Sequence, residues 1–415
     1  MKSNVDTAFV RNARILAFIM AGGKGERLYP LTHERAKPAV PFGGKYRLID
    51  FALSNFVNSG VMSIYVLVRY MSQSLIEYLR LSWRLTGLTR DQFITVVPPQ
   101  MRLGPSWYRG TADAVRQNLN LVRDHAPDVV AVFGADHVYR MDIRQMLRRH
   151  LEAGADLTVS AVRVPLRSAT SLGVIETDPS GRITGFSEKP KRPKAAPGHP
   201  GQAFGSMGNY IFRPNILLEA LEDSSWQDPE LDFGHQVLPK LYPRVKAYAY
   251  DFSEHVLPGL EPGEDTAYWR DVGTLASYYQ ANLDLLGPSP KLNLDNERWR
   301  IHSGRYDGPA AKVLGGRLAN AIIGDGCLID GATLRNSILG RGVKVAPGAV
   351  IEDSLIMDFC RVGAKARVRR AVIDRFNEIA PGTEIGRDPA ADASRYLVDP
   401  SGLVAIGRGR LKNLL

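Results

Sequence analysis

The chain of 415 residues contains only two cysteines, Cys327 and Cys360. They lack the paired C-x-x-C spacing of a thiolate zinc site and are too few for a disulfide framework, so we expect both to be small buried apolar side chains. Long hydrophobic runs are also missing. The early run at residues 15–21 is too short to cross a bilayer, and no signal-peptide pattern precedes it. These absences exclude a disulfide-stapled secreted domain and a zinc-finger array, and they predict a cytoplasmic protein.

The chain has fewer acidic than basic residues. The chain has 53 Lys and Arg against 43 Asp and Glu, which gives a net charge of +10, and its pI is about 9.5. Nucleic acid, an anionic membrane and phosphorylated small molecules are therefore all reasonable partners. The apolar and charged fractions are ordinary for a folded protein, and the length predicts two or three domains.

Short apolar runs alternate with amphipathic patterns from residue 15 to about residue 285. This alternation predicts an α/β domain with a mostly parallel sheet covered by helices. Two further runs, 173–177 and 183–187, flank a Pro/Gly turn and predict an antiparallel hairpin, and residues 189–202 read as an irregular loop. The predicted strands are 15–20, 63–68, 129–133 and 157–162, and the predicted helices are 51–59, 73–80, 111–122 and 144–152.

A different period begins near residue 318. An aliphatic residue followed by a small or acidic one recurs about every six residues, and Ile323, Leu339, Ile356 and Ile373 stand 16, 17 and 17 residues apart. Such a repeat indicates a parallel β-helix, in which each coil stacks on its neighbour. We therefore predict three segments, which are a first domain at 1–286, a linker at 287–317 and the β-helix at 318–415.

The first predicted strand leads into a glycine-rich turn, residues 21–28 (AGGKGERL). Glycines let the backbone turn tightly and point its N–H groups at an anion, although such turns are also common as plain structure. The spacing fits neither the Walker A pattern nor the dinucleotide-binding pattern. Lys37 follows in a setting that the next residue, Pro38, predicts to be extended and non-helical. Arg27 and Lys37 could then clamp a triphosphate.

Several ordered segments carry a resemblance to a known family. The turn and Lys37-Pro38 resemble the entrance motif of sugar-1-phosphate nucleotidyltransferases. With the other segments, the chain from about residue 13 onward is similar to the ADP-glucose pyrophosphorylase (glucose-1-phosphate adenylyltransferase) family of bacterial type. The other segments are 42–51 (FGGKYRLIDF), 107–114 (WYRGTADA), 186–190 (FSEKP) and 268–274 (YWRDVGT).

The resemblance implies a Rossmann-like nucleotidyltransferase domain followed by a left-handed parallel β-helix. It also implies Mg²⁺-dependent transfer of the adenylyl group from ATP to glucose 1-phosphate, giving ADP-glucose and pyrophosphate for glycogen synthesis. Two polyanions must meet in this reaction, and one phosphate oxygen must attack the α-phosphorus in line with the leaving pyrophosphate. Charge neutralisation and alignment therefore do most of the work, and no covalent protein nucleophile is required.

The family's functional positions can be carried over residue by residue. Asp136 also follows a predicted strand directly, where open α/β sheets place their ligands. The resemblance makes Asp136 and Asp271 the Mg²⁺ ligands, and Lys189 the cation for the sugar phosphate. The implied catalytic residues are Arg27, Lys37, Asp136 and Asp271. The implied nucleotide-binding residues are Gly22, Gly23, Gly25, Gln100, Tyr108, Gly110 and Thr111. The implied sugar-site residues are Tyr108, Glu188, Lys189, Ser206, Tyr210, Asp232 and Trp269.

Regulation and assembly are implied as well. Family members are commonly controlled by anionic metabolites and form homotetramers. Two positions depart from enteric members, because Glu34 stands where they carry an activator-binding lysine and Arg69 replaces a glutamine. The positions matching the family's effector pocket are Arg35, Arg47, Arg375 and Arg408, whose guanidinium groups suit bidentate phosphate binding.

Three alternatives stay open. The same chemistry could serve UDP-glucose or GDP-mannose synthesis, although residues 107–114 and 269–274 favour the adenylyl enzyme. A catalytically weak regulatory homologue would be marked by loss of Arg27, Lys37 or Asp136, and all three are present. A nucleic-acid-binding protein would gather basic residues on one face with interleaved aromatics, whereas the cations of this chain are spread out. We expect neither a nucleic-acid nor a membrane partner.

Overall fold

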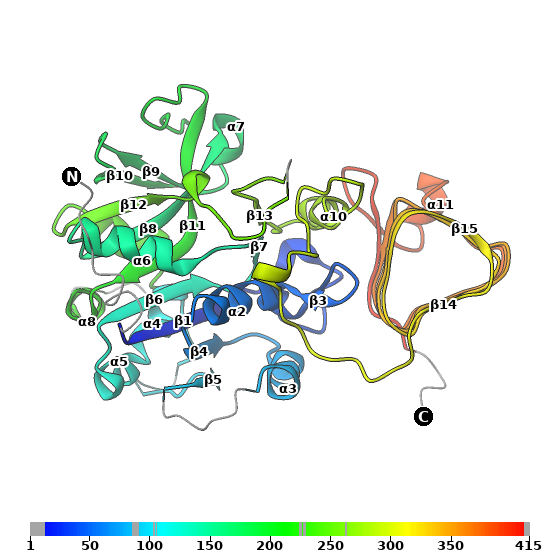
Figure 1. Ribbon diagram of the computed structural model, residues 1–415, viewed down its shortest axis with the longest axis horizontal. Helices are drawn as coiled ribbons and strands as arrows, with labels where there is room; N and C mark the ends of the chain where they lie inside the picture. Colours follow the sequence, from blue (N-terminus) through cyan, green and yellow to red (C-terminus); the bar gives the residue numbers. More distant parts are fainter. Residues whose placement is uncertain are drawn as a thin grey trace.

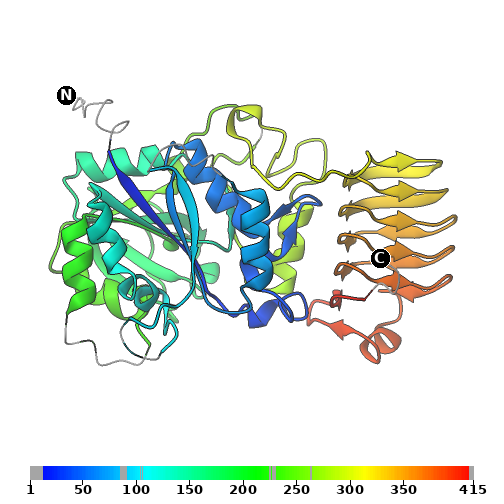
Figure 2. The ribbon, with the colours of Figure 1, turned by 90° about the horizontal axis from the view of Figure 1, so that it is seen from below.

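The computed structural model describes residues 13–84, 91–102, 104, 106–223, 226, 230–261 and 264–410. An α/β domain built on a large sheet is followed by a stack of short strands, and Figures 1 and 2 show the two packed side by side. None of the helices in this described part of the chain has the length and hydrophobicity needed to cross a membrane.

The centre of the large sheet is β1 (Ile15–Ala21), which pairs in parallel with β4 (Ser63–Val68) and β6 (Val129–Gly134). Parallel β5 (Phe93–Val97) extends the sheet beyond β4, and antiparallel β11 (Gln202–Phe212) continues it beyond β6. These pairings confirm the predicted α/β class with its mostly parallel core. The remaining strands of the sheet are β8 (Leu157–Pro165), β9 (Gly173–Thr177), β10 (Ile183–Glu188) and β12 (Ala247–Asp251).

Helices cover both faces of this sheet because β1 is apolar on both sides. Ala17 and Ile19 pack into one buried cluster, and the alternate residues Leu16 and Phe18 pack into another. The first cluster contains α2 (Leu48–Asn58), α3 (Gln73–Ser82) and α6 (Ile143–Glu152). The second contains α4 (Thr111–Arg116), α5 (Leu119–His125) and α8 (Pro214–Glu222). The core therefore has three layers with the sheet in the middle.

Two local predictions need comment. The hairpin of β9 and β10 is antiparallel as expected, with Ile175 opposite Phe186. The single helix expected over 111–122 is wrong, because α4 and α5 are separated at Gln117 and Asn118. The Asn118 amide donates to the carbonyl of Ala114 and to the hydroxyl of Tyr108, and these contacts break the helix between the two segments.

Several short elements complete the α/β domain. The ones that matter for the site are η1 (Glu26–Leu28), η2 (Lys37–Ala39), and the antiparallel pair of β7 (His137–Tyr139) with β13 (Trp269–Asp271). The others are β2 (Pro41–Phe42), β3 (Tyr46–Arg47), α7 (Leu166–Ala169), η3 (Phe233–Val237), α9 (Leu238–Leu241), η4 (Phe252–Glu254), α10 (Leu275–Leu283) and η5 (Glu297–Trp299).

The C-terminal strands form a parallel β-helix, with Ile323 opposite Leu339, Leu339 opposite Ile356, and Ile356 opposite Ile373. The predicted repeat is therefore confirmed in register, and Figure 2 shows the coils stacked like rungs. One face is made of β14 (Lys312–Val313), β16 (Leu328–Ile329), β18 (Lys344–Val345), β21 (Arg361–Val362) and β24 (Glu378–Ile379). The other strands are β15 (Gly316–Ile323), β17 (Ala332–Leu339), β19 (Val350–Glu352), β20 (Leu355–Ile356), β22 (Arg367–Arg369), β23 (Ala371–Ile373), β25 (Glu384–Ile385), β26 (Leu397–Val398) and β27 (Val404–Ile406), and α11 (Pro389–Ala393) lies near the C-terminal end.

One face of the β-helix packs against the α/β domain. Ile338, Leu355 and Val372 share a buried cluster with Phe51 and Tyr278. The stretch expected to be a linker is ordered against α2 and already contains β14, so coil structure begins before residue 318. The two cysteines are buried and unbridged inside the solenoid, and burial raises the pKa of the Cys360 thiol to about 12.

Candidate active site

The glycine-rich turn directly follows β1. Gly25 has a left-handed φ of 66°, and a Cβ at this position would lie 3.0 Å from the Cβ of Lys37 and 3.0 Å from Cγ2 of Thr32. Glycine therefore permits both the backbone conformation and the close approach of Lys37. The Thr32 hydroxyl donates to the Gly25 carbonyl at 2.9 Å, which fixes the turn, and the space where Gly23 would carry a Cβ is open.

Lys37 lies between two carboxylates. Its Nζ is 2.8 Å from Oδ2 of Asp136 and 3.5 Å from Oδ1 of Asp271. The Lys37 side chain is 7% exposed, whereas the two carboxylates are 33% and 30% exposed. The ammonium is therefore buried beneath two acids that face solvent. The expected extended conformation of Lys37 is wrong, because the residue opens the 3-10 turn η2 and Ala36 is the extended residue before it.

The two acids come from distant parts of the chain. Asp136 follows the carboxyl end of β6 by two residues, and Asp271 ends β13, which pairs with β7 so that Asp271 stands opposite His137. Opposite residues of an antiparallel pair point to the same face, and so do alternate residues of one strand. Trp269 therefore lies on the same face, and its ring centroid is 5.1 Å from that of His137.

The Arg27 guanidinium and the Asp271 carboxylate lie on the same side of Gly273. The position that a Gly273 Cβ would occupy lies 3.0 Å from a terminal guanidinium nitrogen of Arg27 and 3.0 Å from both carboxylate oxygens of Asp271. Four of the predicted catalytic groups therefore gather at one place. We call Arg27, Lys37, Asp136 and Asp271 the carboxylate cluster.

The pKa shifts follow from this geometry. Burial alone would raise the pKa of the Asp136 carboxyl, but the Lys37 ammonium and His137 hold it well below its ordinary value. Burial alone would lower the pKa of Lys37, yet the two aspartates raise it above its ordinary value. Lys37 and Asp136 therefore form an ionised pair near neutral pH.

The two aspartates alone are too few ligands for a divalent cation, so further ligands would have to come from substrate phosphates or water. Among the described residues, no three His, Cys, Asp or Glu side chains meet as a complete metal site. Asp136 and Asp271 do share one cation, which is the Lys37 ammonium. Two carboxylates completed by phosphate oxygens and water fit the preference of Mg²⁺ for few protein ligands.

A second group of predicted residues lies around the end of β10. The Lys189 Nζ is 3.0 Å from Oε1 of Glu188, and Lys189 has a φ of 47°, which is rare for a residue with a side chain. The position of a Gly234 Cβ would be 2.7 Å from Oε2 of Glu188 and 3.6 Å from Oδ1 of Asp232. Glu188 and Asp232 are therefore neighbours, with Lys189 half-exposed beside them. We call this the acidic pocket group.

The start of α4 is tied to the same group. The Thr111 hydroxyl donates to Oδ2 of Asp232 at 2.8 Å. Gly110 has a φ of 132°, and a Cβ there would lie 2.3 Å from the carbonyl oxygen of Leu231, so only glycine fits. Tyr210 is buried with its ring 5.2 Å from that of Phe233, and burial with the nearby Asp232 raises its pKa.

His137 lies between the carboxylate cluster and strand β11. A Cβ on Gly134 would lie 3.3 Å from its Nδ1, and a Cβ on Gly208 would lie 3.6 Å from its Cε1. Gly208 belongs to β11 and donates its backbone N–H to the hydroxyl of Ser206 at 3.3 Å. The strand that carries Ser206 and Tyr210 therefore runs beside the carboxylate cluster.

Comparison with known proteins agrees with this geometry. Residues 16–287 match the nucleotidyl transferase family, and residues 309–406 match the GlmU-like C-terminal hexapeptide family. A glucose-1-phosphate adenylyltransferase of Thermodesulfovibrio yellowstonii is 48% identical over 96% of this chain and 97% of its own length. Relatives of the same name from Corynebacterium jeikeium and Photobacterium profundum are 47% and 46% identical, each over 95% of this chain and 98% of their own length.

The chain belongs to the glucose-1-phosphate adenylyltransferase family. This membership confirms the resemblance stated from the sequence motifs, and it makes the protein a nucleotidyltransferase.

Two predicted nucleotide-binding side chains form hydrogen bonds with the backbone near the end of β5. Tyr108 is only 2% exposed, and its hydroxyl donates to the carbonyl of Pro98 at 3.1 Å while accepting from Asn118. Gln100 is exposed and donates to the same carbonyl at 2.8 Å. Tyr108 thus anchors its loop in the core, and contact of either side chain with a nucleotide stays a prediction.

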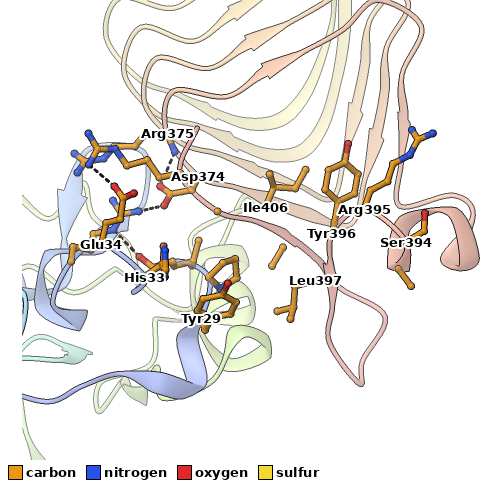
Figure 3. A pocket seen from close by; sticks show the side chains of 17 residues that line it. Tyr29, His33, Glu34, Asp374, Arg375, Ser394, Arg395, Tyr396, Leu397 and Ile406 are labelled. Atoms are coloured by element: carbon orange, nitrogen blue, oxygen red, sulfur yellow. Dashed lines mark hydrogen bonds and ion pairs between the residues drawn. The ribbon is translucent and has the colours of Figure 1, made fainter. Parts of the chain in front are cut away.

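Three of the predicted effector arginines, Arg35, Arg375 and Arg408, line a cavity of about 470 Å³ where the β-helix meets the α/β domain. Figure 3 shows this cavity with Arg375 and Asp374 on one side of it. Arg35 is buried, forms an ion pair with the buried Asp374, and donates its Nε to the carbonyl of Leu31 at 2.8 Å. Arg408 forms a more exposed pair with Glu34 at 3.0 Å. We call this set, Arg35, Arg47, Arg375 and Arg408 with Asp374 and Glu34, the arginine cluster.

Positive charge in the arginine cluster is only partly compensated. Burial, together with the charges of Arg35, Arg47 and Arg408, lowers the pKa of Arg375 to about 10. Within the part of the chain that the structure describes, one terminal nitrogen of Arg35 and the Nε of Arg375 are buried and have no hydrogen-bond partner. Buried donors without partners are costly, and an anion in the cavity could satisfy them. Arg47 lies outside the cavity lining and stacks on Tyr78 at 4.3 Å.

Sequence reasoning missed several residues of these sites. His137 is one, because its ring packs on Trp269 and its buried Nδ1 has no hydrogen-bond partner among the described residues. Asp374 is another, since only the fold shows that it pairs with Arg35. Glu34 was named as a departure from the family, but its pairing with Arg408 was not predicted. Adjacency to Asp136 and to Arg375 was the available signal for His137 and Asp374.

Proposed function

We propose that this protein catalyses the Mg²⁺-dependent reaction of ATP with glucose 1-phosphate to give ADP-glucose and pyrophosphate. The proposal agrees with the name of its relatives, glucose-1-phosphate adenylyltransferase. The observation that carries this proposal is the carboxylate cluster, in which Lys37 bridges Asp136 and Asp271 next to the glycine-rich turn. ADP-glucose made in the cytoplasm would supply glycogen synthesis.

Each group has a defined role in the proposed reaction. The backbone N–H groups of the turn at Gly22, Gly23 and Gly25 cradle the triphosphate, and Arg27 and Lys37 neutralise its charge. This neutralisation lets the sugar phosphate approach the α-phosphorus and stabilises charge as pyrophosphate departs. Asp136 and Asp271 would hold Mg²⁺, which supplies further charge neutralisation on the phosphate oxygens.

The acidic pocket group supports recognition of glucose 1-phosphate. Glu188 and Asp232 are neighbouring acceptors for sugar hydroxyls, and Lys189 beside them is a cation for the sugar phosphate. Trp269, whose Nε1 is buried without a partner, and the Ser206 hydroxyl add further hydrogen-bonding groups on the side of His137.

The activity is tested by measuring pyrophosphate release from purified protein with Mg²⁺, ATP and glucose 1-phosphate. We expect turnover with ATP to exceed turnover with UTP or GTP at least tenfold. Faster turnover with UTP would make the enzyme a UDP-sugar pyrophosphorylase, and no turnover with any nucleotide would make it a regulatory homologue.

The sugar site is tested by Lys189→Ala. Loss of the phosphate cation is expected to raise the KM for glucose 1-phosphate about 10- to 100-fold with little change in kcat. Lys191→Ala, an exposed lysine in the same loop, is the matched control and should leave both constants unchanged. A fall in kcat at constant KM for Lys189→Ala would reject the assigned role.

We further propose that the arginine cluster binds anionic effectors. The partnerless buried nitrogens of Arg35 and Arg375 beside the cavity support this. Glu34, paired with Arg408, puts a negative charge at this site. Activity and binding should be screened with phosphate, AMP, pyruvate, fructose 6-phosphate and fructose 1,6-bisphosphate. Absence of any effect from all five anions would overturn the assignment.

We also propose that the protein forms a homotetramer. The first coil of the β-helix supports self-association, because Val313, Leu314 and Leu318 are exposed and strand β15 is paired through β17 on one side. An open strand edge with apolar side chains favours pairing with another chain. Sedimentation should give about four times the 45.8 kDa of one chain, and a mass near 45.8 kDa would contradict the proposal.

A further inference from the structure

Lys37 occupies the position that a metal ion would need. Its Nζ contacts one oxygen of Asp136 at 2.8 Å and approaches one oxygen of Asp271 at 3.5 Å, with 93% of its side chain covered. The carboxylates are more exposed than Lys37, so a cation from solvent can reach them. Their negative charge is, however, already balanced by the ammonium. Arg27, close to Asp271 on the same side of Gly273, adds a second positive group.

We propose that the Lys37 ammonium is the resident cation of this site in the free enzyme, and that it makes binding of the divalent cation depend on the nucleotide. This inference rests on the proposed function and adds an order of events to it. While Lys37 bridges the acids, an incoming divalent cation meets an ammonium in its place and a guanidinium beside it. Free metal should therefore bind weakly.

The structure also indicates how the contact is released. The stem of Lys37 is fixed, because its Cβ packs at Gly25 and η2 holds its backbone, with the Val40 N–H donating to the Lys37 carbonyl at 3.0 Å. Only the distal part of the side chain is free to swing. Since the stem lies against the glycine-rich turn, a triphosphate seated on that turn competes with Asp136 and Asp271 for the same ammonium.

Charge balance then favours joint arrival of metal and nucleotide. When Nζ moves to a phosphate, the two carboxylates lose their counter-charge and become a strong site for a cation. The metal ion bound to the triphosphate is the cation closest to the two carboxylates at that moment, and it takes the place of Lys37. The same lysine thus keeps the acids neutral in the free enzyme and neutralises phosphate in the complex.

The test is binding of Mn²⁺ alone, followed by electron paramagnetic resonance of the free ion, with no nucleotide present. Wild-type protein should bind Mn²⁺ weakly, and Lys37→Met should bind it at least tenfold more tightly. The matched control is Lys24→Met, which removes the same charge from the same turn at an exposed lysine paired with Glu26. That variant should stay within about twofold of wild type.

Two additions keep the result interpretable. Adding Asp136→Asn to Lys37→Met should abolish the gain in affinity, because the gain needs both carboxylates. If Lys37→Met does not fold, as judged by circular dichroism and thermal unfolding, Lys37→Gln removes the charge while keeping a polar end group and should show the same tightening.

Two outcomes would overturn the inference, and both differ from failure of the proposed function. One is unchanged Mn²⁺ affinity in the folded Lys37 variants, and the other is tight Mn²⁺ binding by wild-type protein without nucleotide. Either can occur in an enzyme that releases pyrophosphate normally. Absence of pyrophosphate release by wild-type protein would instead reject the proposed function.

Discussion

Two charge clusters in this molecule use the same kinds of side chain in different proportion. In the carboxylate cluster, Asp136 and Asp271 are balanced by Lys37 and by the neighbouring Arg27. In the arginine cluster, Asp374 pairs with Arg35 and Glu34 pairs with Arg408. Arg47 and Arg375 form no salt bridge with any residue that the structure describes.

The difference lies in what each cluster needs from a ligand. The carboxylate cluster is internally neutral, so it must exchange its own lysine before it can take a metal. The arginine cluster has surplus positive charge and buried donors without partners, so it can accept an anion with less rearrangement. The first arrangement suits a reaction that assembles its charges in order, and the second suits a sensor of free anions.

The variant Asp136→Asn tests the role of the carboxylate cluster and should have the largest effect. This change keeps the shape of the side chain but removes one of the two charges that hold Lys37 and, in the proposed reaction, Mg²⁺. We expect kcat to fall by roughly 10³-fold, since charge stabilisation of this kind contributes several kcal/mol to a transition state. Steady-state kinetics with ATP and glucose 1-phosphate provide the measurement, and circular dichroism provides the folding control. A fall of less than tenfold would remove Asp136 from the chemistry.

In the arginine cluster the largest effect should fall on stability rather than on chemistry. Asp374→Asn leaves the buried guanidinium of Arg35 without its counter-charge, and breaking such a pair costs about 3–5 kcal/mol. Urea unfolding measures the loss. The double variant Arg35→Met with Asp374→Leu should recover much of it. Equal stability of Asp374→Asn and wild type would show that the buried pair is not ionised.

A buried histidine outside both clusters should control stability in mild acid. His255 lies outside both clusters, and burial lowers its pKa to about 4. The unfolded chain binds a proton near pH 6.5, so stability should be present above that pH and be lost as pH falls toward 4, by up to about 3 kcal/mol. His255→Gln should remove about half of this slope in urea unfolding, because burial also lowers the pKa of His150 to about 4. An unchanged slope in the variant would place the sensitivity elsewhere.

The smallest expected effect is that of Arg408→Ala. Its pair with Glu34 is exposed, with 39% and 45% of the two side chains accessible, so stability should change by less than about 1 kcal/mol. Affinity for inorganic phosphate, measured by titration calorimetry, should still fall about threefold to tenfold. Unchanged affinity would exclude Arg408 from the anion site.

The fold was largely predictable because hydrophobic pattern dominates it. The runs of β1, β4 and β6 are buried strands at the expected positions, and the spacing of Ile323 and Leu339 places them opposite one another in neighbouring coils. The break between α4 and α5 was not predictable. It depends on Asn118 reaching the hydroxyl of Tyr108, and a periodicity argument cannot see that contact.

The sequence identified which residues belong to the sites, but it did not show which of them contact one another. Motifs named Lys37, Asp136 and Asp271 separately, yet their shared contact requires the pairing of β7 with β13 across more than 130 residues. The contact between Arg35 and Asp374 spans 339 residues and depends on docking of the β-helix. A sequence motif shows which charged side chains are present, whereas the neutralisation of one charge by another depends on tertiary packing.

Crystals grown with Mn²⁺ and a non-hydrolysable ATP analogue would test the account most directly. The account predicts one strong anomalous peak within coordination distance of both Asp136 and Asp271, with the Lys37 Nζ moved from the carboxylates to a phosphate oxygen. A peak at another position, or Lys37 still bridging the two aspartates in the complex, would contradict it.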